Sequence, residues 1–262
     1  METGFIHNMF LHQLITPIYK GKGSKCKAVN YRPISLTSHI IKVFERVIRN
    51  KLVNYLEENQ IISPNQHGFR KGRSCLSELL AHYEDIMLNS NSGKGTDTVY
   101  LDFAKAFDKV DHKLLLEKLK RVGIKGKLLN WFKAFLSNRK QEVVVDGFKS
   151  FIHAVLSGVP QGSVLGPILF IIFINDMADT LKYVKLKSFA DDTKILSSIS
   201  NQTDANKLQD DLDSVLQWAI ENNMVLNEEK FEFLKHNYHF DSFLMELPGS
   251  HYMSCYQTNS TY

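Results

Sequence analysis

The sequence predicts an α+β fold built on an antiparallel sheet with helices. Two stretches read as β-hairpins: VVVDGF (143–148) carries the turn pair Asp146-Gly147, and YVKLKSFADDTKIL (183–196) contains a run that alternates apolar and polar residues. Segments with apolar residues three and four apart, the helical spacing, lie before, between and after them. Strands that pair with their sequence neighbours favour this arrangement over a doubly wound parallel sheet.

Two helices are expected before residue 90. From Thr37 to Glu58 the apolar residues form one helical stripe with Ser38 as the N-cap, and a second helix covers about 76–88. The members of the stripe are Ile40, Ile41, Phe44, Val47, Ile48, Leu52 and Leu56. The segment SPNQHGFRKGRS (63–74) is predicted as a loop from its Pro, Asn and Gly content. Polar residues 89–97 mark the strongest domain boundary.

The second half alternates strands and helices. In chain order the expected elements are a strand at 98–103, helices at 111–123 and near 127–136, the hairpin at 143–148, a loop at 157–167, the apolar run 168–174, the hairpin at 183–199 with Asp191-Asp192 as its turn, and an amphipathic helix at 201–221. Asp111 is the expected cap of the first of these helices. The longest apolar run is too short to cross a membrane and is expected in the core.

The composition is that of a globular protein. The chain has 262 residues, 44% of them hydrophobic, enough for one large domain or two modest ones. Its three cysteines, at distant positions, fit neither metal-binding spacing nor a disulfide framework, which favours a reducing compartment. The N-terminus METGFIHNMFLHQLI has no basic region and an interrupted apolar run, unlike a secretory signal. An intracellular protein is expected, with nucleus or cytoplasm left open.

Basic residues are concentrated in the first part of the chain. Between Pro17 and Arg73 there are twelve Lys or Arg and three Glu, whereas residues 201–230 carry seven acids and two Lys. A solvated surface is the ordinary explanation of such a distribution. A basic front half is also what a phosphate-rich partner requires, since Lys and Arg displace counterions from nucleic acid.

Two adjacent carboxylates, Asp191 and Asp192, stand in an otherwise apolar hairpin. Side by side they repel each other, and a divalent cation such as Mg²⁺ would compensate them better than an exposed lysine. Asp102, at the end of a predicted strand, could bring a third carboxylate to the same place and complete a two-metal site. The alternative is that Asp-Asp is an ordinary turn pair. Asp108 and Asp111 precede a helix, where an Asp is more often a cap.

Several motifs resemble those of one enzyme family. LDFAKAFDKVDH (101–112), SGVPQGSVLGP (157–167) and FADDTKIL (189–196), in this order, resemble core motifs of reverse transcriptases, most closely those of non-LTR (LINE-type) retrotransposons. The segments PIYKGKGSKCKAVNYRPISL and QHGFRKGRSC resemble the family's finger motifs, and LNEEK (226–230) resembles its last palm motif. The resemblance covers about residues 17–234.

The resemblance implies a right-hand polymerase with a ferredoxin-like palm sheet, fingers before it and a thumb after it. The expected divisions are an unmatched stub at 1–16, partial fingers at 17–95, the palm at 96–234 and an unmatched tail at 235–262. Because the sequence no longer resembles the family after Leu234, we expect a palm-and-fingers fragment without a thumb.

The resemblance also implies the roles of individual residues. Asp102, Asp191, Asp192 and the carbonyl of Phe103 would bind Mg²⁺, or Mn²⁺ in its place, for nucleotidyl transfer to a primer 3′-hydroxyl. Phe107 would exclude the ribose 2′-hydroxyl and so favour deoxynucleotides. The other residues expected around the nucleotide are Gln161, Gly162, Arg70, Arg32, Lys20 and Lys230, the last as a proton donor to pyrophosphate. An RNA template, a DNA primer and deoxynucleoside triphosphates are the expected partners, with no membrane; protein partners stay open.

Two other functions remain as alternatives. One is a catalytically impaired, nucleic-acid-binding remnant of a retrotransposon. The other is a palm-type RNA polymerase or nucleotide cyclase, which would share the metal carboxylates and would not need a bulky ring at Phe107.

Overall fold

The computed structural model describes residues 11–236 and the backbone of 256–257. They form two compact units, and each unit combines a sheet with helices, so the α+β prediction is confirmed. Unit 1 comprises the chain up to Ile61 and Phe107–Phe173, and unit 2 comprises Ile62–Ala106 and the chain from Ile174 onward. The expectations for residues 1–10 and for most of the tail at 235–262, including Cys255, lie outside the described residues; Cys26 and Cys75 are free and exposed.

Unit 1 contains a sheet with the strand order β2-β1-β4-β5, in which β6 also pairs with β4. The strands are β1 (His12–Tyr19), β2 (Tyr31–Leu36), β4 (Lys140–Val145), β5 (Phe148–Lys149) and β6 (His153–Ala154), with the 3₁₀ turn η2 (Ala28–Asn30) between the first two. Asp146 and Gly147 both have positive φ, +51° and +83°, in the two-residue turn between β4 and β5. This conformation matches the right-handed twist of the strands, and the predicted hairpin is confirmed.

The helices of this part of the chain also follow the prediction, except for the short α3, which was not predicted. They are α1 (His39–Glu58), α3 (Ala106–Lys109), α4 (His112–Arg121), α5 (Gly126–Leu136) and α6 (Gly166–Ile174). Asp111 caps α4, because its carboxylate accepts the backbone N–H groups of Lys113 and Leu114 at 2.8 and 3.1 Å. The apolar run becomes α6, which is core as expected. In residues 11–236 no helix has the length and hydropathy to cross a membrane.

The predicted stripe on α1 is only half correct. Ile41, Ile48, Leu52 and Leu56 are buried, as expected. The other three members are exposed: Ile40, Phe44 and Val47. The most deeply buried polar side chain of the helix is instead Glu45, which lies on the same side as Ile41 and Ile48. Helical spacing identifies the apolar positions, but tertiary contacts decide which of them are covered.

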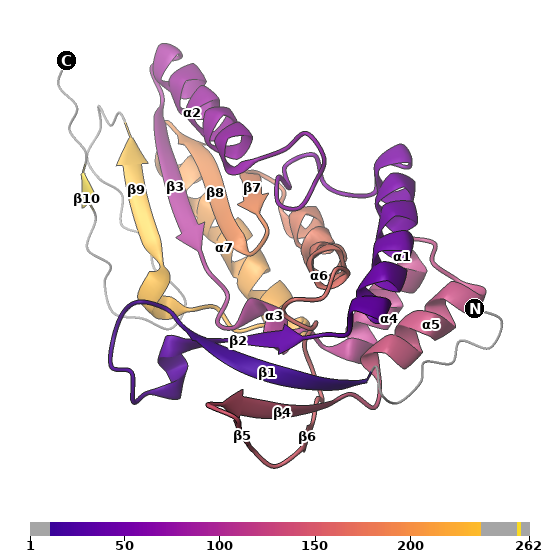
Figure 1. Ribbon diagram of the computed structural model, residues 1–262. Coiled ribbons are helices and arrows are strands. Elements are labelled where there is room, and N and C mark those ends of the chain that lie inside the picture. The colour runs from indigo at the N-terminus through magenta and orange to yellow at the C-terminus, as the bar shows by residue number, and fades with distance from the viewer. Residues whose placement is uncertain (1–10, 237–255, 258–262) are drawn as a thin grey trace. The chain divides into compact units, whose positions relative to one another are not determined.

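Unit 2 is built on a second sheet with the order β10-β9-β3-β8-β7 (Figure 1). Its strands are β3 (Gly95–Leu101), β7 (Lys185–Phe189), β8 (Asp192–Ile199), β9 (Glu232–His236) and β10 (Tyr256–Gln257), and its helices are α2 (Cys75–Asn91) and α7 (Gln202–Glu221). Two 3₁₀ segments complete it, η3 (Asn175–Thr180) and η4 (Glu228–Lys230). All neighbouring strands are antiparallel except β10, which runs parallel to β9.

The two helices of unit 2 cover opposite faces of the central strand. The ring of Tyr100 faces α2, whereas the preceding and following positions face α7: Leu101 lines an apolar cavity of about 260 Å³ together with α7 residues such as Leu212 and Val215. Alternation along a strand requires this arrangement. The face under α7 is apolar, and Trp218 of α7 donates its indole N–H to Asp176 at 2.9 Å.

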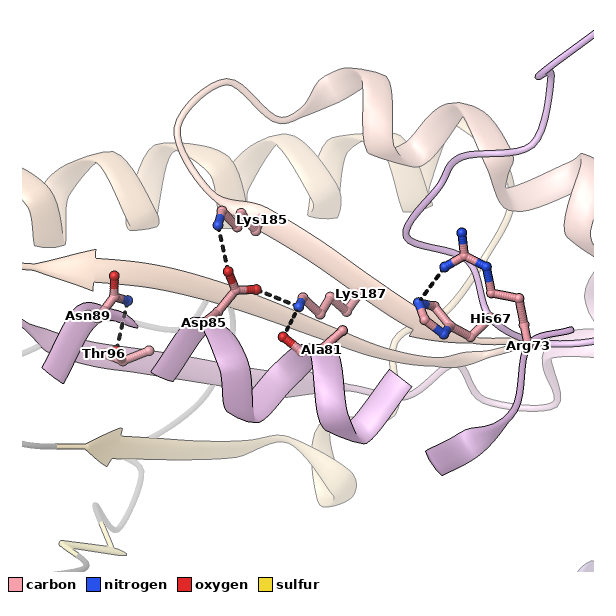
Figure 2. A network of polar contacts seen from close by, with 8 residues as sticks. All are labelled: His67, Arg73, Ala81, Asp85, Asn89, Thr96, Lys185 and Lys187. Atoms are coloured by element: carbon pink, nitrogen blue, oxygen red, sulfur yellow. Dashed lines mark hydrogen bonds and ion pairs between the residues drawn. The ribbon is translucent and has the colours of Figure 1, made fainter. Parts of the chain in front are cut away.

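The face under α2 is unusually polar for a buried layer (Figure 2). Asp85 of α2 forms ion pairs with Lys185, at 2.6 Å, and with Lys187 of β7. Glu78 pairs with Lys194 of β8 at 2.9 Å. Buried charges are stable only when they are paired and hydrogen-bonded, so these pairs explain how α2 can pack a polar side against the sheet.

Candidate active site

The turn of the β7–β8 hairpin lies one residue earlier than predicted. Phe189 pairs with Asp192, so the two residues of the turn are Ala190 and Asp191, and Asp192 begins β8. Asp191 is half-buried and Asp192 is exposed. The two carboxylates are therefore not equivalent, because one belongs to the turn and the other to a strand.

Asp102 directly follows β3, and backbone hydrogen bonds to residues 225–227 hold it in place. The Asn227 N–H donates to the Asp102 carbonyl at 2.8 Å, and the Ala104 N–H donates to the Val225 carbonyl at 2.8 Å. These bonds flank an antiparallel bridge between Phe103 and Leu226, so the carbonyl of Phe103 points away from the second strand. The segment 225–227 thus extends the pairing of β3 beyond its end and fixes the position of Asp102.

The three predicted metal-binding carboxylates lie at the same end of the sheet in unit 2. Leu101 pairs with Thr193 at the end of the β3–β8 ladder. Asp102, the next residue after Leu101, and Asp192, the residue before Thr193, therefore both lie at this end. Burial, together with the negative charges of Asp192 and Asp102, raises the pKa of Asp191. The sequence-based expectation that these carboxylates repel one another is therefore supported by the electrostatics of the site.

A lysine partly neutralises this cluster. The ammonium of Lys230, in η4, lies 2.9 Å from Asp102 Oδ2, and the Lys230 side chain is 59% exposed. The side-chain amide of Asn227 donates to the same oxygen at 3.3 Å. Asn227 was not predicted as a site residue; the sequence signal for it is its place in LNEEK (226–230), six residues after the end of the amphipathic helix at Glu221.

The donors at this site suit a hard divalent cation, although no complete cage is formed. Within residues 11–236, no three His, Cys, Asp or Glu side chains are close enough together to hold a metal ion. Carboxylate and carbonyl oxygens are nevertheless the ligands that Mg²⁺ takes, usually with one or two carboxylates and the phosphates of a substrate. Asp102, Asp191 and Asp192 fit that pattern, with Lys230 as the cation that now contacts Asp102.

Three residues expected at the nucleotide lie in unit 1, where each contacts another segment of that unit. Gln161 donates its side-chain amide to Asp108 Oδ1 at 2.8 Å, and its carbonyl accepts the Ser35 N–H at 2.8 Å. Gly162 has φ +102°, and a Cβ there would lie 2.8 Å from the carbonyl oxygen of Ser35. The ring of Phe107 stacks on Phe170 of α6 with centroids 4.4 Å apart. Glycine is therefore required at 162, and Phe107 has a packing role whether or not it also contacts a sugar.

The three basic residues expected at the triphosphate have different surroundings. Arg32, on β2, is exposed. The ammonium of Lys20 donates to the Val29 carbonyl at 2.8 Å within the β1–β2 connection. Arg70, in unit 2, donates to the carbonyls of Ser63 and Gln66 at 2.8 and 3.2 Å. Arg70 therefore stabilises the conformation of its own loop.

Comparisons with known proteins agree with the motifs. The family described as "Reverse transcriptase (RNA-dependent DNA polymerase)" matches residues 19–243. The RNA-directed DNA polymerase from mobile element jockey of Drosophila melanogaster is 33% identical over 88% of this chain and 26% of its own length. The probable RNA-directed DNA polymerase from transposon X-element of the same species is 34% identical over 83% of this chain and 24% of its own. The chain thus spans about a quarter of the length of these relatives.

The fold is shared with solved structures of much lower sequence identity. Apo telomerase from Candida tropicalis, truncated from its C-terminal domain, superimposes with a TM-score of 0.64 at 14% identity, covering 94% of this chain and 54% of that one. Another structure of Candida tropicalis telomerase, in complex with a fragment of telomeric RNA, gives a TM-score of 0.63 at 13% identity, covering 88% of this chain and 42% of that one. The ordered motifs, the carboxylates at the end of the sheet and the match over most of its length show that the chain belongs to the reverse transcriptase family, with proteins of non-LTR retrotransposons as its relatives.

Proposed function

We propose that this chain carries the polymerase site of an RNA-directed DNA polymerase, which extends a primer 3′-hydroxyl on an RNA template with deoxynucleotides and releases pyrophosphate. The observation that carries the proposal is the location of Asp102, Asp191 and Asp192 at the same end of the β3–β8 ladder. Family membership supports the same reaction. The assignment of residues 17–95 to fingers and 96–234 to a palm belongs to this proposal; both compact units contain residues of each range.

Divalent metal ions, Mg²⁺ or Mn²⁺, are the proposed cofactor, held by the three carboxylates and the carbonyl of Phe103. When bound, such ions polarise the phosphate and lower the pKa of the attacking hydroxyl. Burial and the negative charges of Asp192 and Asp102 raise the pKa of Asp191, so without a cation its charge is less favourable in the folded protein than in the unfolded chain. The chain itself supplies the anionic oxygens and the fixed backbone that positions them.

Lys230 is the proposed proton donor to the leaving pyrophosphate. Its contact with Asp102 supports a location next to the carboxylates, and its exposed side chain can turn toward a substrate phosphate. Phe107, Gln161, Gly162, Arg32, Lys20 and Arg70 are proposed to contact the incoming nucleotide. Arg offers bidentate contacts to phosphate, and Lys offers a point charge.

A primer-extension assay on the full chain tests this function. Purified protein, an annealed RNA template and DNA primer, deoxynucleotides and Mg²⁺ should give extended primer, and Asp191→Asn should reduce the rate by about a hundredfold or more. The matched control is Asp179→Asn, a change of the same chemistry at an exposed aspartate of η3, which should keep the wild-type rate.

The results also separate the alternatives. Extension equal in wild type and Asp191→Asn would reject the proposed site, and salt-sensitive RNA binding without any extension would favour a non-catalytic remnant. Deoxynucleotide preference tests Phe107: the change Phe107→Val should increase ribonucleotide use, whereas wild-type protein that uses ribonucleotides equally well would favour an RNA polymerase.

A further inference from the structure

The turn of the β7–β8 hairpin holds an alanine in a backbone conformation that favours glycine. Ala190, which immediately precedes Asp191, has φ +58° and is 4% exposed. Residues with a Cβ enter this left-handed region only at a cost, and alanine has no polar side chain to offset it. Contacts from outside the turn must therefore hold Ala190 in place.

Those contacts come from the side chain of Gln66, which is 4% exposed. Gln66 Oε1 accepts the N–H of Ala190 at 2.9 Å and the N–H of Gly68 at 2.7 Å. Gln66 Nε2 donates to Ser188 Oγ at 3.0 Å and to the carbonyl of Ala190 at 3.3 Å. The amide thus makes two bonds as acceptor and two as donor, its full capacity, and two of the four hold the N–H and C=O of the strained residue.

The backbone around Gln66 is fixed to β7 as well. Gln66 and Ser188 form a parallel bridge, in which the His67 N–H donates to the Ser188 carbonyl at 2.8 Å and the Ser188 N–H donates to the Asn65 carbonyl at 3.0 Å. The guanidinium of Arg70 donates to the carbonyl of Gln66. The loop is therefore joined to the edge strand β7 at this bridge, and the side chain of Gln66 is directed at the turn.

Side chains of the same loop connect it to α2. Figure 2 shows the ring of His67 next to Arg73, whose guanidinium lies 3.0 Å from His67 Nε2. The other ring nitrogen, Nδ1, lies 2.8 Å from the hydroxyl of Ser77. Burial and the Arg73 charge lower the pKa of His67, which favours the neutral ring that can accept from Arg73. Gly68 also allows close approach, because a Cβ there would collide with the backbone nitrogen of Ala190.

We infer that Gln66 is a positioning residue for the polymerase reaction: it holds Ala190 in the left-handed conformation and thereby sets the direction of the Asp191 side chain in the turn. The inference rests on the proposed metal site, because it is the carboxylate of Asp191 that must face the cations. Outer residues that orient metal ligands commonly change metal affinity by tenfold or more when they are replaced.

Hydrogen exchange of the metal-free protein tests the contact without using activity. In the wild-type chain, the Ala190 amide should exchange slowly, and in Gln66→Met, which keeps the length of the side chain and removes the amide, it should exchange at least about tenfold faster. Gln217→Met is the matched control, because Gln217 is exposed and donates to Glu221 of its own helix. A wild-type Ala190 amide that exchanges as fast as an exposed one would overturn the inference, whatever the variants do.

Binding of Mn²⁺ alone, followed by electron paramagnetic resonance of the free ion, tests the consequence. Gln66→Met should weaken Mn²⁺ affinity by about tenfold, whereas Gln217→Met should not change it. If wild-type protein binds no Mn²⁺ at all, the proposed metal site fails, and the exchange experiment still decides whether Gln66 holds the turn.

A second substitution separates positioning from general stability. Glycine enters the left-handed region freely. The double variant Gln66→Met/Ala190→Gly should therefore bind Mn²⁺ several-fold more tightly than Gln66→Met alone, although it restores none of the four hydrogen bonds. If Gln66 only stabilised the fold, the double variant should bind Mn²⁺ no better than Gln66→Met, because losing the Ala190 methyl group as well would not improve metal binding. Unchanged affinity in Gln66→Met, or no recovery in the double variant, overturns the inference. If Gln66→Met does not fold, Gln66→Asn, which keeps the amide and shortens its reach, replaces it in the same comparisons.

Discussion

The buried His82 should make the stability of unit 2 depend on pH. His82 lies on the buried side of α2 with 3% of its surface exposed, and its ring faces those of Tyr83 and Tyr100. Burial first, and then the charge of Lys194, lower the pKa of His82 from 6.5 to about 4, against a smaller opposing effect of Glu78. His236 and Lys187 act in the same direction as Lys194.

The sign and size of the effect follow from this shift. Because the pKa is lower in the folded protein than in the unfolded chain, the unfolded chain binds more protons between the two values. The contribution is therefore fully present above pH 6.5 and is lost as the pH falls toward about 4. One pKa unit corresponds to about 1.4 kcal/mol, so His82 alone should remove roughly 2.5 kcal/mol of the free energy of unfolding between about pH 7.5 and about pH 4.5.

Urea unfolding at these two pH values, for wild type and for His82→Phe, measures the effect. The phenylalanine ring retains the aromatic contacts and cannot be protonated, so the variant should lose roughly 2.5 kcal/mol less than wild type on acidification. Other acid-sensitive groups, such as His67, titrate in both proteins and cancel in the difference. An equal loss in both proteins would refute the reasoning, because it would mean that His82 is protonated without cost in the fold.

Three further substitutions test other parts of the structure. Glu45→Ala should lower the free energy of unfolding by about 3 kcal/mol in a urea titration, because it leaves two N–H groups at the start of α6 without their carboxylate acceptor, whereas the exposed Glu58→Ala should change it by less than about 0.5 kcal/mol. Gly158→Ala should destabilise by about 2 kcal/mol more than Gly147→Ala: both glycines have positive φ, but only at 158 would a Cβ lie 2.8 Å from the backbone of Asp108, and equal costs would contradict this. Asp191→Asn should raise the melting temperature of the metal-free protein at neutral pH, since the raised pKa of Asp191 makes its charge unfavourable there; a lower melting temperature would contradict this.

Local sequence signals were sufficient for most elements of the fold. The cap at Asp111, the Asp146-Gly147 turn and the apolar spacing of α7 each act over a few residues, so each could be recognised without knowledge of the tertiary structure. The apolar stripe of α1 shows what such local signals cannot predict. Glu45 is buried there because its carboxylate accepts the N–H groups of Val164 and Leu165, at 2.6 and 3.0 Å, and no spacing rule connects residues so far apart in the chain.

The candidate site also has features that the local sequence reveals and features that it does not. Its carboxylates could be found from the sequence because two adjacent aspartates in an apolar hairpin are electrostatically unfavourable without a compensating charge. Their turn was predicted one residue late, because aspartate is itself a good turn residue and nothing local favours Ala190 in its place. The register is set by the β7–β8 ladder and by Gln66, whose side chain reaches the turn from a different loop.

Each of the two strand ends that supply the carboxylates depends on a segment far away in the sequence. Asp102 is fixed by residues 225–230, and Asp191 lies in a turn held by Gln66, so neither carboxylate is positioned by a strand of the β3–β8 ladder alone. The two supports share no residue, and they act on opposite sides of the same charge cluster. A change in either support should therefore alter metal affinity, while a change that removes both should cost more than the sum only if the carboxylates share a cation. Pairing Asn227→Ala with Gln66→Met in a double-mutant cycle on Mn²⁺ affinity would measure that coupling directly.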